Sequence, residues 1–344
     1  MTDAKDVVMD VSGLSKHFAA RGTGFMQRHK RYVHAVDDVS FQVHRGEILA
    51  LVGESGSGKS TIARVLVGLY PATTGTAIFG GKDVLKLRGR RELLRYRSQV
   101  QMVFQDPFGS LNPVKTVGYH IERPLIVHGR TRGRGSTRSR VLELLTTVGL
   151  TPPEDVAAKL PNQLSGGQRQ RVSFARALAI DPELVLADEP ISMLDVSIRM
   201  GVLNLMAKLR DERGLSYLYI THDLASARYL ADRVLVLYAG HIMETAAAEI
   251  LMAEPLHPYT KLLLSAVPKP RHAASRVRIE ARGEIPTVID PKPGCRFAAR
   301  CPFVMDRCRS DTPPLFEVGP NRLVRCFLYD GPISSGVVST VAHA

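Results

Sequence analysis

A glycine-rich segment followed by a lysine and two hydroxyl residues is the strongest chemical signal in the 344-residue chain. It fits the spacing G-x-x-x-x-G-K-[ST], in which glycines let backbone N–H groups close around phosphate oxygens. Lys59 is expected to reach the β- and γ-phosphates of a nucleotide, and the Ser60 hydroxyl to bind Mg²⁺. The alternative is a glycine-rich turn with a surface lysine. The segment comprises Gly53, Glu54, Ser55, Gly56, Ser57, Gly58, Lys59, Ser60 and Thr61.

Two adjacent carboxylates follow an apolar run, and the first of them lies 129 residues after the lysine (188 − 59). The run Leu184–Asp188 is typical of a buried strand. Asp188 is expected to hold Mg²⁺, directly or through water, and Glu189 to polarise an attacking water as a general base. An Asp-Glu pair after a strand is common, so its place after the glycine-rich segment makes the pattern specific.

A third segment places small residues and one hydroxyl at a predicted helix start: Leu164, Ser165, Gly166, Gly167 and Gln168. Free N–H groups there can cradle a second anion, and the alternative is an ordinary helix N-cap. With the two segments above, it resembles the signature motif of ATP-binding cassette (ABC) ATPases. This resemblance implies that the segment faces the γ-phosphate of ATP held by a second cassette.

The same resemblance implies roles for isolated residues. Gln105 matches the Q-loop glutamine, which touches Mg²⁺ and water, and Asp195 matches the D-loop aspartate. His222 follows a predicted strand and matches the switch histidine that contacts the γ-phosphate, although a lone histidine is more often structural. Phe18 is the expected adenine-stacking aromatic, with Tyr32 as its rival.

The four cysteines, Cys295, Cys301, Cys308 and Cys326, all follow residue 294. Their spacing, C-x5-C-x6-C-x17-C, lacks the closely paired cysteines usual in structural zinc sites. Four thiolates spread around a short, loop-rich module can instead surround an iron–sulfur cubane. We expect a [4Fe–4S] cluster, with a Zn²⁺ site or reduced structural thiols as the alternatives.

The C-terminal part resembles the closing segment and extension of oligopeptide and dipeptide importers. The resemblance lies in His257–Pro268, Gly283–Pro286, Gly294–Phe297 and Arg300–Pro302. It implies an ATP-hydrolysing subunit that energises peptide uptake. Extensions that resemble this one carry a [4Fe–4S] cluster in some peptide permeases. Related importers take up nickel or sugar oligomers, so the cargo stays open.

The elements that must position these residues follow from the apolar pattern. Alternation predicts strands in Val7–Leu14 and Val39–Val43, and short apolar runs predict buried strands at Ile48–Gly53, 184–188, 216–220 and Val234–Tyr238. Helical spacing predicts helices at Thr61–Leu69, near Ser197–Arg213 and across 110–180, where Gly129–Ser139 interrupts them. The loop Arg21–Arg31 is expected to be exposed and the tail Ser334–Ala344 frayed.

Strands alternating with helices predict an α/β fold with a largely parallel sheet. The resemblance makes this a RecA-like P-loop NTPase: an ABC nucleotide-binding domain with an antiparallel β subdomain and a helical subdomain. We expect the ATPase domain to span residues 1–265, with the helical signature subdomain at about 106–180. Residues 266–344 would form a small cysteine-containing extension.

The chain carries 46 Lys+Arg against 33 Asp+Glu, a formal net charge of +13. Two arginine clusters could face nucleic acid or anionic lipid, or could be ordinary solvated surface. They lack interleaved aromatic residues, which weakens a single-strand nucleic-acid interpretation. A soluble ABC ATPase acting on nucleic acid or ribosomes is therefore the rival, and no direct nucleic-acid contact is expected. The clusters are Arg88, Arg90, Arg91, Arg95, Arg97 and Arg130, Arg132, Arg134, Arg138, Arg140.

No stretch reaches the 18 or so apolar residues that a membrane helix requires, and the N-terminus lacks an apolar signal core. The expectation is a peripheral protein on the cytoplasmic face of the cell membrane, held there by partners. Those partners would be a second ABC ATPase subunit, identical or paralogous, two transmembrane permease subunits and, indirectly, an extracytoplasmic solute-binding protein.

Overall fold

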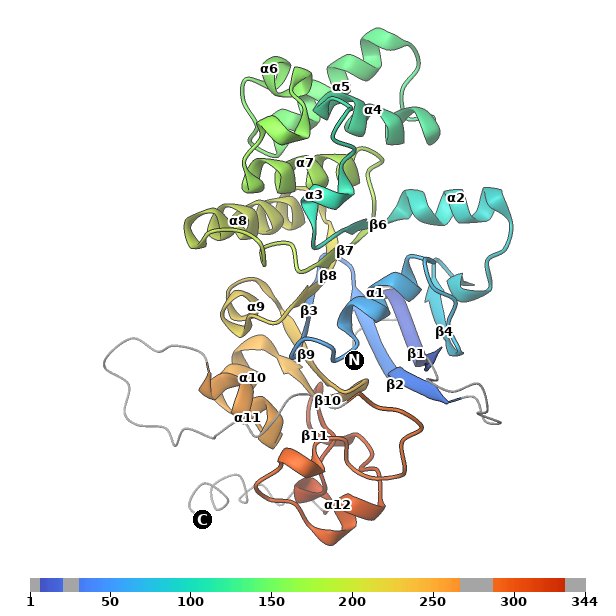
Figure 1. Ribbon diagram of the computed structural model, residues 1–344, viewed down its shortest axis with the longest axis vertical. Coiled ribbons are helices and arrows are strands. Elements are labelled where there is room, and N and C mark those ends of the chain that lie inside the picture. Colours follow the sequence, from blue (N-terminus) through green and yellow to red (C-terminus); the bar gives the residue numbers. More distant parts are fainter. Residues whose placement is uncertain (1–6, 21–30, 267–286, 332–344) are drawn as a thin grey trace.

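The computed structural model describes residues 7–20, 31–266 and 287–331 (Figure 1). The predicted frayed tail and residues 21–30 of the predicted exposed loop lie outside these ranges. The described chain forms one large mixed sheet, one smaller antiparallel sheet and a helical lobe. In Figure 1 the lobe of helices α4 to α7 lies at one end of the molecule and residues 287–331 lie at the other.

The large sheet has eight strands, and its centre agrees with the predicted buried strands. In spatial order they are β11 (Phe316–Gly319), β12 (Arg322–Val324), β10 (His241–Ala247), β9 (Arg233–Tyr238), β3 (Ile48–Val52), β8 (Ser216–Thr221), β7 (Leu184–Asp188) and β6 (Val100–Val103). Strands β9, β3, β8, β7 and β6 pair in parallel, as expected, whereas β10, β12 and β11 pair antiparallel. The antiparallel part, which the sequence did not predict, brings the C-terminal region into the sheet.

Strand β3 is buried on both faces and separates two hydrophobic cores. Leu49 and Leu51 pack into one core, and Ile48, Ala50 and Val52 into the other. This division follows from the alternation of side chains along a strand. An apolar residue is therefore needed at every position, which fixes the strand that leads into the glycine-rich segment.

The smaller sheet has the strand order β2 (Tyr32–His44), β1 (Val7–Ala19), β4 (Thr74–Phe79), β5 (Lys82–Asp83). All its pairings are antiparallel. The predicted strands Val7–Leu14 and Val39–Val43 are therefore confirmed, and the observed strands β1 and β2 extend beyond the predicted segments. Register shifts along β1 and β2 bend the pair.

The helices cover the large sheet and build the lobe. They are α1 (Lys59–Leu66), α2 (Arg90–Gln99), α3 (Pro107–Ser110), α4 (Val117–Val127), α5 (Arg134–Thr147), α6 (Pro153–Ala158), α7 (Gly166–Leu178), α8 (Val196–Arg213), α9 (Leu224–Leu230), α10 (Ala248–Ala253), α11 (Pro258–Ser265) and α12 (Asp306–Ser310). Short 3-10 turns occupy Val84–Lys86, Pro161–Gln163, Ala298–Arg300 and Phe327–Tyr329. Among the described residues, no helix is both long and apolar enough to cross a membrane.

Two helix predictions need correction. The predicted interruption Gly129–Ser139 is too long, because α5 begins at Arg134, directly after Gly133 at a positive φ of 84°. The hydroxyls of Ser136 and Thr137 bond the Gly133 carbonyl, so residues expected to break the helix instead support its first turn. Helix α1 ends at Leu66 rather than at residue 69, because Gly68 turns the chain at φ 74°.

Candidate functional site

The glycine-rich segment, hereafter the P-loop, joins β3 to α1 and is clamped by backbone from elsewhere in the chain. A Cβ atom on Gly58 would lie 2.2 Å from the Ala35 carbonyl oxygen, so this position accepts only glycine. The Gly240 N–H donates to the Ser57 carbonyl at 2.9 Å. The Glu54 N–H donates to the Tyr259 hydroxyl at 3.0 Å. The loop is therefore held from three sides.

Lys59 lies across the P-loop and is almost fully buried. Its Nζ donates to the carbonyls of Gly53 and Glu54, both at 2.8 Å. Burial lowers its pKa, while the carboxylates of Glu189, Asp188 and Glu54 oppose that shift. The two carbonyl oxygens therefore fix the ammonium group beside the P-loop, where it can bind a phosphate oxygen.

Ser60 and Asp188 meet as predicted for a Mg²⁺ site. The Ser60 hydroxyl donates to Asp188 Oδ1 at 2.7 Å, and the buried Asp188 Oδ2 has no hydrogen-bond partner among the described residues. Burial raises the pKa of Asp188, against the opposing effects of Ser60 and Arg64. An unpartnered buried carboxylate oxygen beside a hydroxyl is the hard-oxygen donor set that Mg²⁺ prefers. These residues therefore fit the ion.

Glu189 is contacted by two residues that the sequence analysis singled out separately from it. Gln105 Nε2 donates to Glu189 Oε2 at 3.0 Å, and His222 Nδ1 lies 3.2 Å from the same oxygen. The hydrogen bond with His222 lowers the pKa of Glu189 and raises the pKa of His222. Glu189 has a φ of 45°, a left-handed conformation that is strained for this residue type and is concentrated at functional sites.

Apart from Asp188 and the P-loop residues Gly53 and Ser57, the predicted site residues described above line one cleft of about 570 Å³. The sequence analysis did not predict Ala35 and Leu263 as part of the lining. Ala35 carries no chemical signal, and Leu263 lies within a segment that the sequence linked only to the C-terminal resemblance. The lining residues are Ala35, Glu54, Ser55, Gly56, Gly58, Lys59, Ser60, Thr61, Gln105, Glu189, His222 and Leu263.

The predicted signature residues lie elsewhere, at the start of α7. Ser165 caps the helix, since its Oγ accepts from the Gln168 N–H at 3.3 Å, while Gln168 Oε1 accepts from the Ser165 N–H at 3.0 Å. Asp195 precedes α8 and is exposed. Among the described residues that line the cleft, none comes from this segment. The role that the resemblance implies for it, at the ATP of a second, identical or paralogous cassette, stays a prediction.

Neither candidate for the adenine-stacking aromatic is among the described residues that line the cleft. Phe18 packs edge-on against Tyr70, with 5.5 Å between ring centroids, and Lys16 Nζ lies 4.8 Å from the Phe18 ring. Tyr32 is partly exposed, and its backbone pairs with Asp290. Phe18 pairs with Val33 and Tyr32 pairs with Ala19, so the two residues lie one register position apart on β1 and β2. Both stay candidates.

The four cysteines are free and converge in the C-terminal module, which we define as residues 287–331. Burial, together with the nearby Cys295, Cys301 and Cys308, raises the pKa of Cys326 to about 12. Burial likewise raises the pKa of Cys295 to about 11. The Cys295 N–H donates to the Cys308 carbonyl at 2.8 Å, which closes the loop between these two cysteines.

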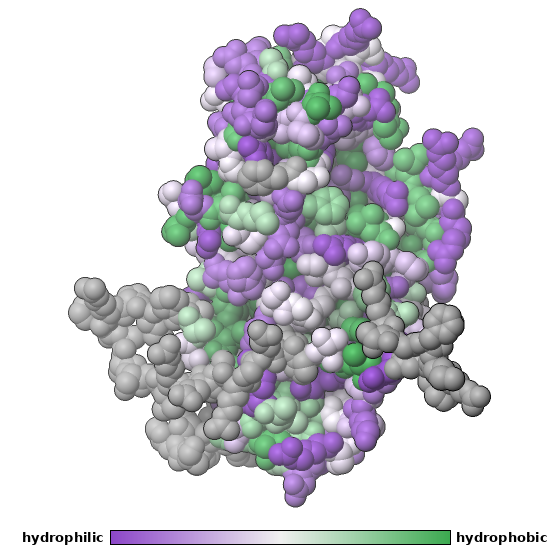
Figure 2. All heavy atoms as spheres, viewed as in Figure 1, coloured by the Kyte–Doolittle hydropathy of each residue, from purple (hydrophilic) through white to green (hydrophobic). Residues whose placement is uncertain are grey.

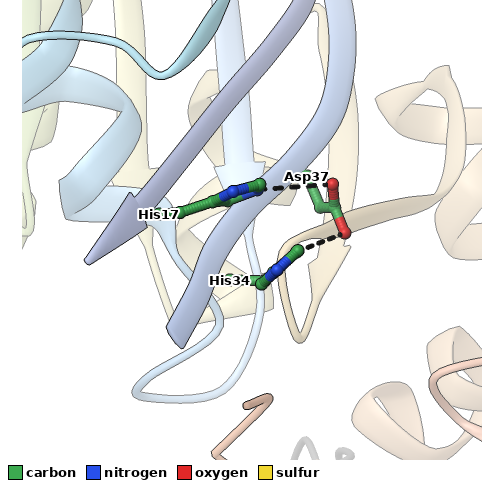
Figure 3. A group of neighbouring side chains, drawn as sticks. All are labelled: His17, His34 and Asp37. Atoms are coloured by element: carbon green, nitrogen blue, oxygen red, sulfur yellow. Dashed lines mark hydrogen bonds and ion pairs between the residues drawn. The ribbon is translucent and has the colours of Figure 1, made fainter. Parts of the chain in front are cut away.

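A separate group of titratable side chains lies on β1 and β2 (Figure 3). His34 Nδ1 is 3.1 Å from Asp37 Oδ2, and His17 Nε2 is 3.7 Å from Asp37 Oδ1. Within the described chain, this trio alone brings three metal-ligand atoms within 4.8 Å of one another. Arg296 Nη2 donates to Asp37 Oδ2 at 2.6 Å, so a guanidinium already neutralises the carboxylate. Interactions with His241, 3.7 Å away, and with His34 hold the pKa of Asp37 well below its usual range.

Several arginines of the two clusters bind their own chain. Arg88 donates to the Leu85 and Leu87 carbonyls, and Arg140 pairs with Glu143 at 2.6 Å and with Asp181 at 2.7 Å. Figure 2 shows hydrophilic side chains over the outer end of the helical lobe. These contacts support the interpretation of the clusters as solvated surface.

Two family descriptions match the chain. Residues 36–192 match the family described as ABC transporter, and residues 243–308 match the oligopeptide/dipeptide transporter C-terminal region. Among curated proteins, the oligopeptide transport ATP-binding protein AppF of Bacillus subtilis is 44% identical, over 94% of this chain and 98% of its own length. The dipeptide transport ATP-binding protein DppF of Haemophilus influenzae is 42% identical, over 94% and 97%.

Solved structures agree with the sequence relatives. The ABC cassette MJ0796, in a dimeric post-hydrolysis state with ADP and phosphate, is 32% identical and superposes with a TM-score of 0.61. The alignment covers 70% of this chain and 98% of that cassette. The chain therefore belongs to the ABC transporter family, as an ATPase of the oligopeptide/dipeptide transport ATP-binding group.

Proposed function

We propose that this chain hydrolyses ATP to drive the import of oligopeptides or dipeptides through a membrane permease. The observation that carries the proposal is the occurrence of both parts in one chain. A cleft holds Lys59, Ser60, Glu189 and His222 together, and the module that follows matches the C-terminal region of oligopeptide/dipeptide transporters. Relatives named for oligopeptide and dipeptide transport support the cargo class.

The residues of the cleft divide the work of phosphoryl transfer. P-loop N–H groups and Lys59 would bind the phosphates, and Ser60 and Asp188 would hold Mg²⁺, which would neutralise phosphate charge. Glu189 accepts a hydrogen bond from the attacking water and takes its proton. Gln105 and His222, both bonded to Glu189 Oε2, orient that carboxylate and keep it ionised.

The signature segment would act on a partner. Ser165 and the N–H groups at the start of α7 would bind the γ-phosphate of ATP in a second cassette, which is the same chain or a paralogue. Closing and reopening of this pair would move two transmembrane permease subunits on the cytoplasmic face of the membrane. An extracytoplasmic solute-binding protein would deliver the peptide.

Reconstitution tests the cargo class. The chain, its partner cassette and the permease subunits in nanodiscs, supplied with the solute-binding protein, should hydrolyse ATP faster when di- or oligopeptides are added. Nickel ions and sugar oligomers at matched concentrations are the controls. Stimulation by either of these, and not by peptides, would contradict the peptide assignment while leaving the ATPase intact.

We also propose that the four cysteines hold a [4Fe–4S] cluster. The spacing C-x5-C-x6-C-x17-C lacks the closely paired cysteines usual in structural zinc sites. Four thiolates spread around a short module can instead surround a cubane, in which each thiolate binds a different iron, and this supports a cluster.

Anaerobic purification tests the cluster. We expect a brown protein with absorbance near about 400 nm and about four iron atoms per chain. Cys308→Ser should lose both iron and colour, whereas Ser310→Ala, two residues away on the exposed side of α12, should keep them. A colourless protein with one zinc per chain, or with neither metal, would contradict the cluster.

A further inference from the structure

We propose that Arg300 of the C-terminal module is a positioning residue of the ATP site, which neutralises Glu54 so that the P-loop accepts a polyphosphate. The inference rests on the proposed phosphate-binding role of the P-loop. Glu54 lines the cleft, next to the loop N–H groups and Lys59. Arg300 lies 246 residues away along the chain and directly precedes Cys301.

The contact between these two residues is a two-pronged ion pair. Arg300 Nη1 donates to Glu54 Oε2 at 2.8 Å, and Nη2 donates to Oε1 at 3.0 Å. This fork-to-fork geometry is the strongest form of the arginine–carboxylate pair. The Arg300 side chain is only 6% exposed and that of Glu54 is 29% exposed, so solvent screens the pair less than a surface salt bridge.

Aromatic rings hold Arg300 in place. Its guanidinium lies 5.7 Å from the Tyr238 ring and 5.9 Å from the Phe297 ring, and these rings meet edge to face at 5.3 Å. Tyr259 packs against the same rings, and its hydroxyl accepts the Glu54 N–H. Both the carboxylate and the backbone of Glu54 are therefore held by residues outside the P-loop.

A second route joins the module to the loop and supports the same conclusion. Arg296 bonds Asp37, whose N–H donates to the Gly240 carbonyl at 3.0 Å. The Gly240 N–H in turn donates to the Ser57 carbonyl of the P-loop. Arg296 and Arg300 thus reach the P-loop by independent paths.

Charge explains why the pair matters for ATP. A carboxylate on a phosphate-binding loop repels the phosphates and offers Lys59 a competing anion. Paired with Arg300, Glu54 contributes no net charge to the cleft. Without Arg300, the negative charge of Glu54 is left unpaired in the cleft, where it repels the negatively charged phosphates of ATP.

The test is equilibrium binding of a fluorescent Mg-ATP analogue to the full chain, purified anaerobically. Arg300→Gln should raise the dissociation constant at least about tenfold, because a like charge is exposed to the ligand. Arg300→Lys should keep most of the affinity, since it keeps the positive charge. The matched control Arg309→Gln removes an exposed arginine of the same module and should bind like the wild type.

The double variant Arg300→Gln with Glu54→Gln separates charge from folding. It removes both members of the pair, and we expect its dissociation constant to return to within about threefold of the wild type. A double variant as weak as Arg300→Gln would overturn the proposal, as would Arg300→Gln with wild-type affinity. Failure of the wild type itself to bind ATP would instead contradict the proposed function. Metal content and thermal unfolding on the same samples report whether each variant is folded.

Discussion

Glu189, the carboxylate that we propose as general base, combines backbone strain with charge stabilisation. Its φ of 45° places it in a conformation that a non-glycine residue rarely adopts, and its N–H bonds the Ile220 carbonyl at 2.9 Å. Gln105 and His222 converge on one of its oxygens. The neighbouring ends of β6, β7 and β8 therefore place two partners on the carboxylate, the kind of pre-organisation that a catalytic group requires.

Replacing this carboxylate should separate binding from chemistry. Glu189→Gln keeps the shape of the side chain but removes its basicity, so we expect ATP hydrolysis to fall at least about 100-fold while ATP binding remains. Phosphate release and fluorescent-nucleotide binding measure the two effects. Glu143→Gln, on the exposed face of α5, is the matched control and should hydrolyse ATP normally. Retained turnover in Glu189→Gln would remove Glu189 from the role of general base.

At the scale of elements, close packing of two helices sets the start of the signature helix. A Cβ atom on Gly167 would lie 2.3 Å from Ile198 Cγ2, a contact between α7 and α8. Ile198 is β-branched and stiff at χ1, so it cannot easily turn away. The glycine is therefore required by packing, in addition to any role of its N–H group in phosphate binding.

Gly167→Ala should therefore destabilise the protein by about 1–3 kcal/mol, through overpacking against α8. Chemical denaturation measures the change. The matched control is Gly135→Ala in α5, where no described residue comes within 4 Å of the new methyl group. There we expect no loss, or a gain of up to about 1 kcal/mol from helix propensity. Adding Ile198→Ala to Gly167→Ala should give less than the sum of the two single effects; strict additivity would contradict the contact.

At the scale of the whole molecule, buried histidines link folding to pH. His257 caps α11 through its Nδ1, which accepts the Tyr259 N–H at 3.0 Å, and burial lowers its pKa to about 3. An unfolded histidine has a pKa of about 6.5. As the pH falls below about 6.5, the unfolded chain binds a proton that the folded chain does not, so stability is lost.

His257→Asn should weaken this pH dependence, because asparagine can cap the helix without titrating. Between about pH 6.5 and pH 5, the slope of unfolding free energy against pH should decrease by up to about 1.4 kcal/mol per unit. Neighbouring Glu244, whose pKa is raised by burial, contributes a slope of opposite sign that is common to both proteins. Parallel slopes for variant and wild type would contradict a neutral His257 in the folded state.

Local motifs explain how much could be predicted from the sequence. The P-loop, the strand Leu184–Asp188 and the helix cap at Ser165 each depend on residues close together in the chain, and each lies where it was expected. The family pattern singled out Gln105, Glu189 and His222 separately, and their convergence follows only from the neighbouring ends of β6, β7 and β8 in the folded sheet. The predicted start of α5 was wrong. The Gly- and Arg-rich sequence suggested a loop, whereas the Ser136 and Thr137 hydroxyls bond the Gly133 carbonyl and support the first turn of the helix.

The sequence by itself determined the nucleotide chemistry, because phosphate binding needs a short, contiguous set of backbone and side-chain groups. Only the tertiary structure decided how the C-terminal module joins the cassette. The pairing of β12 with β10 and the bond from Arg300 to Glu54 connect segments with no periodic pattern in common. A charged pair separated by 246 residues leaves no local signature, since its partners become neighbours only when the sheet and its aromatic packing have formed.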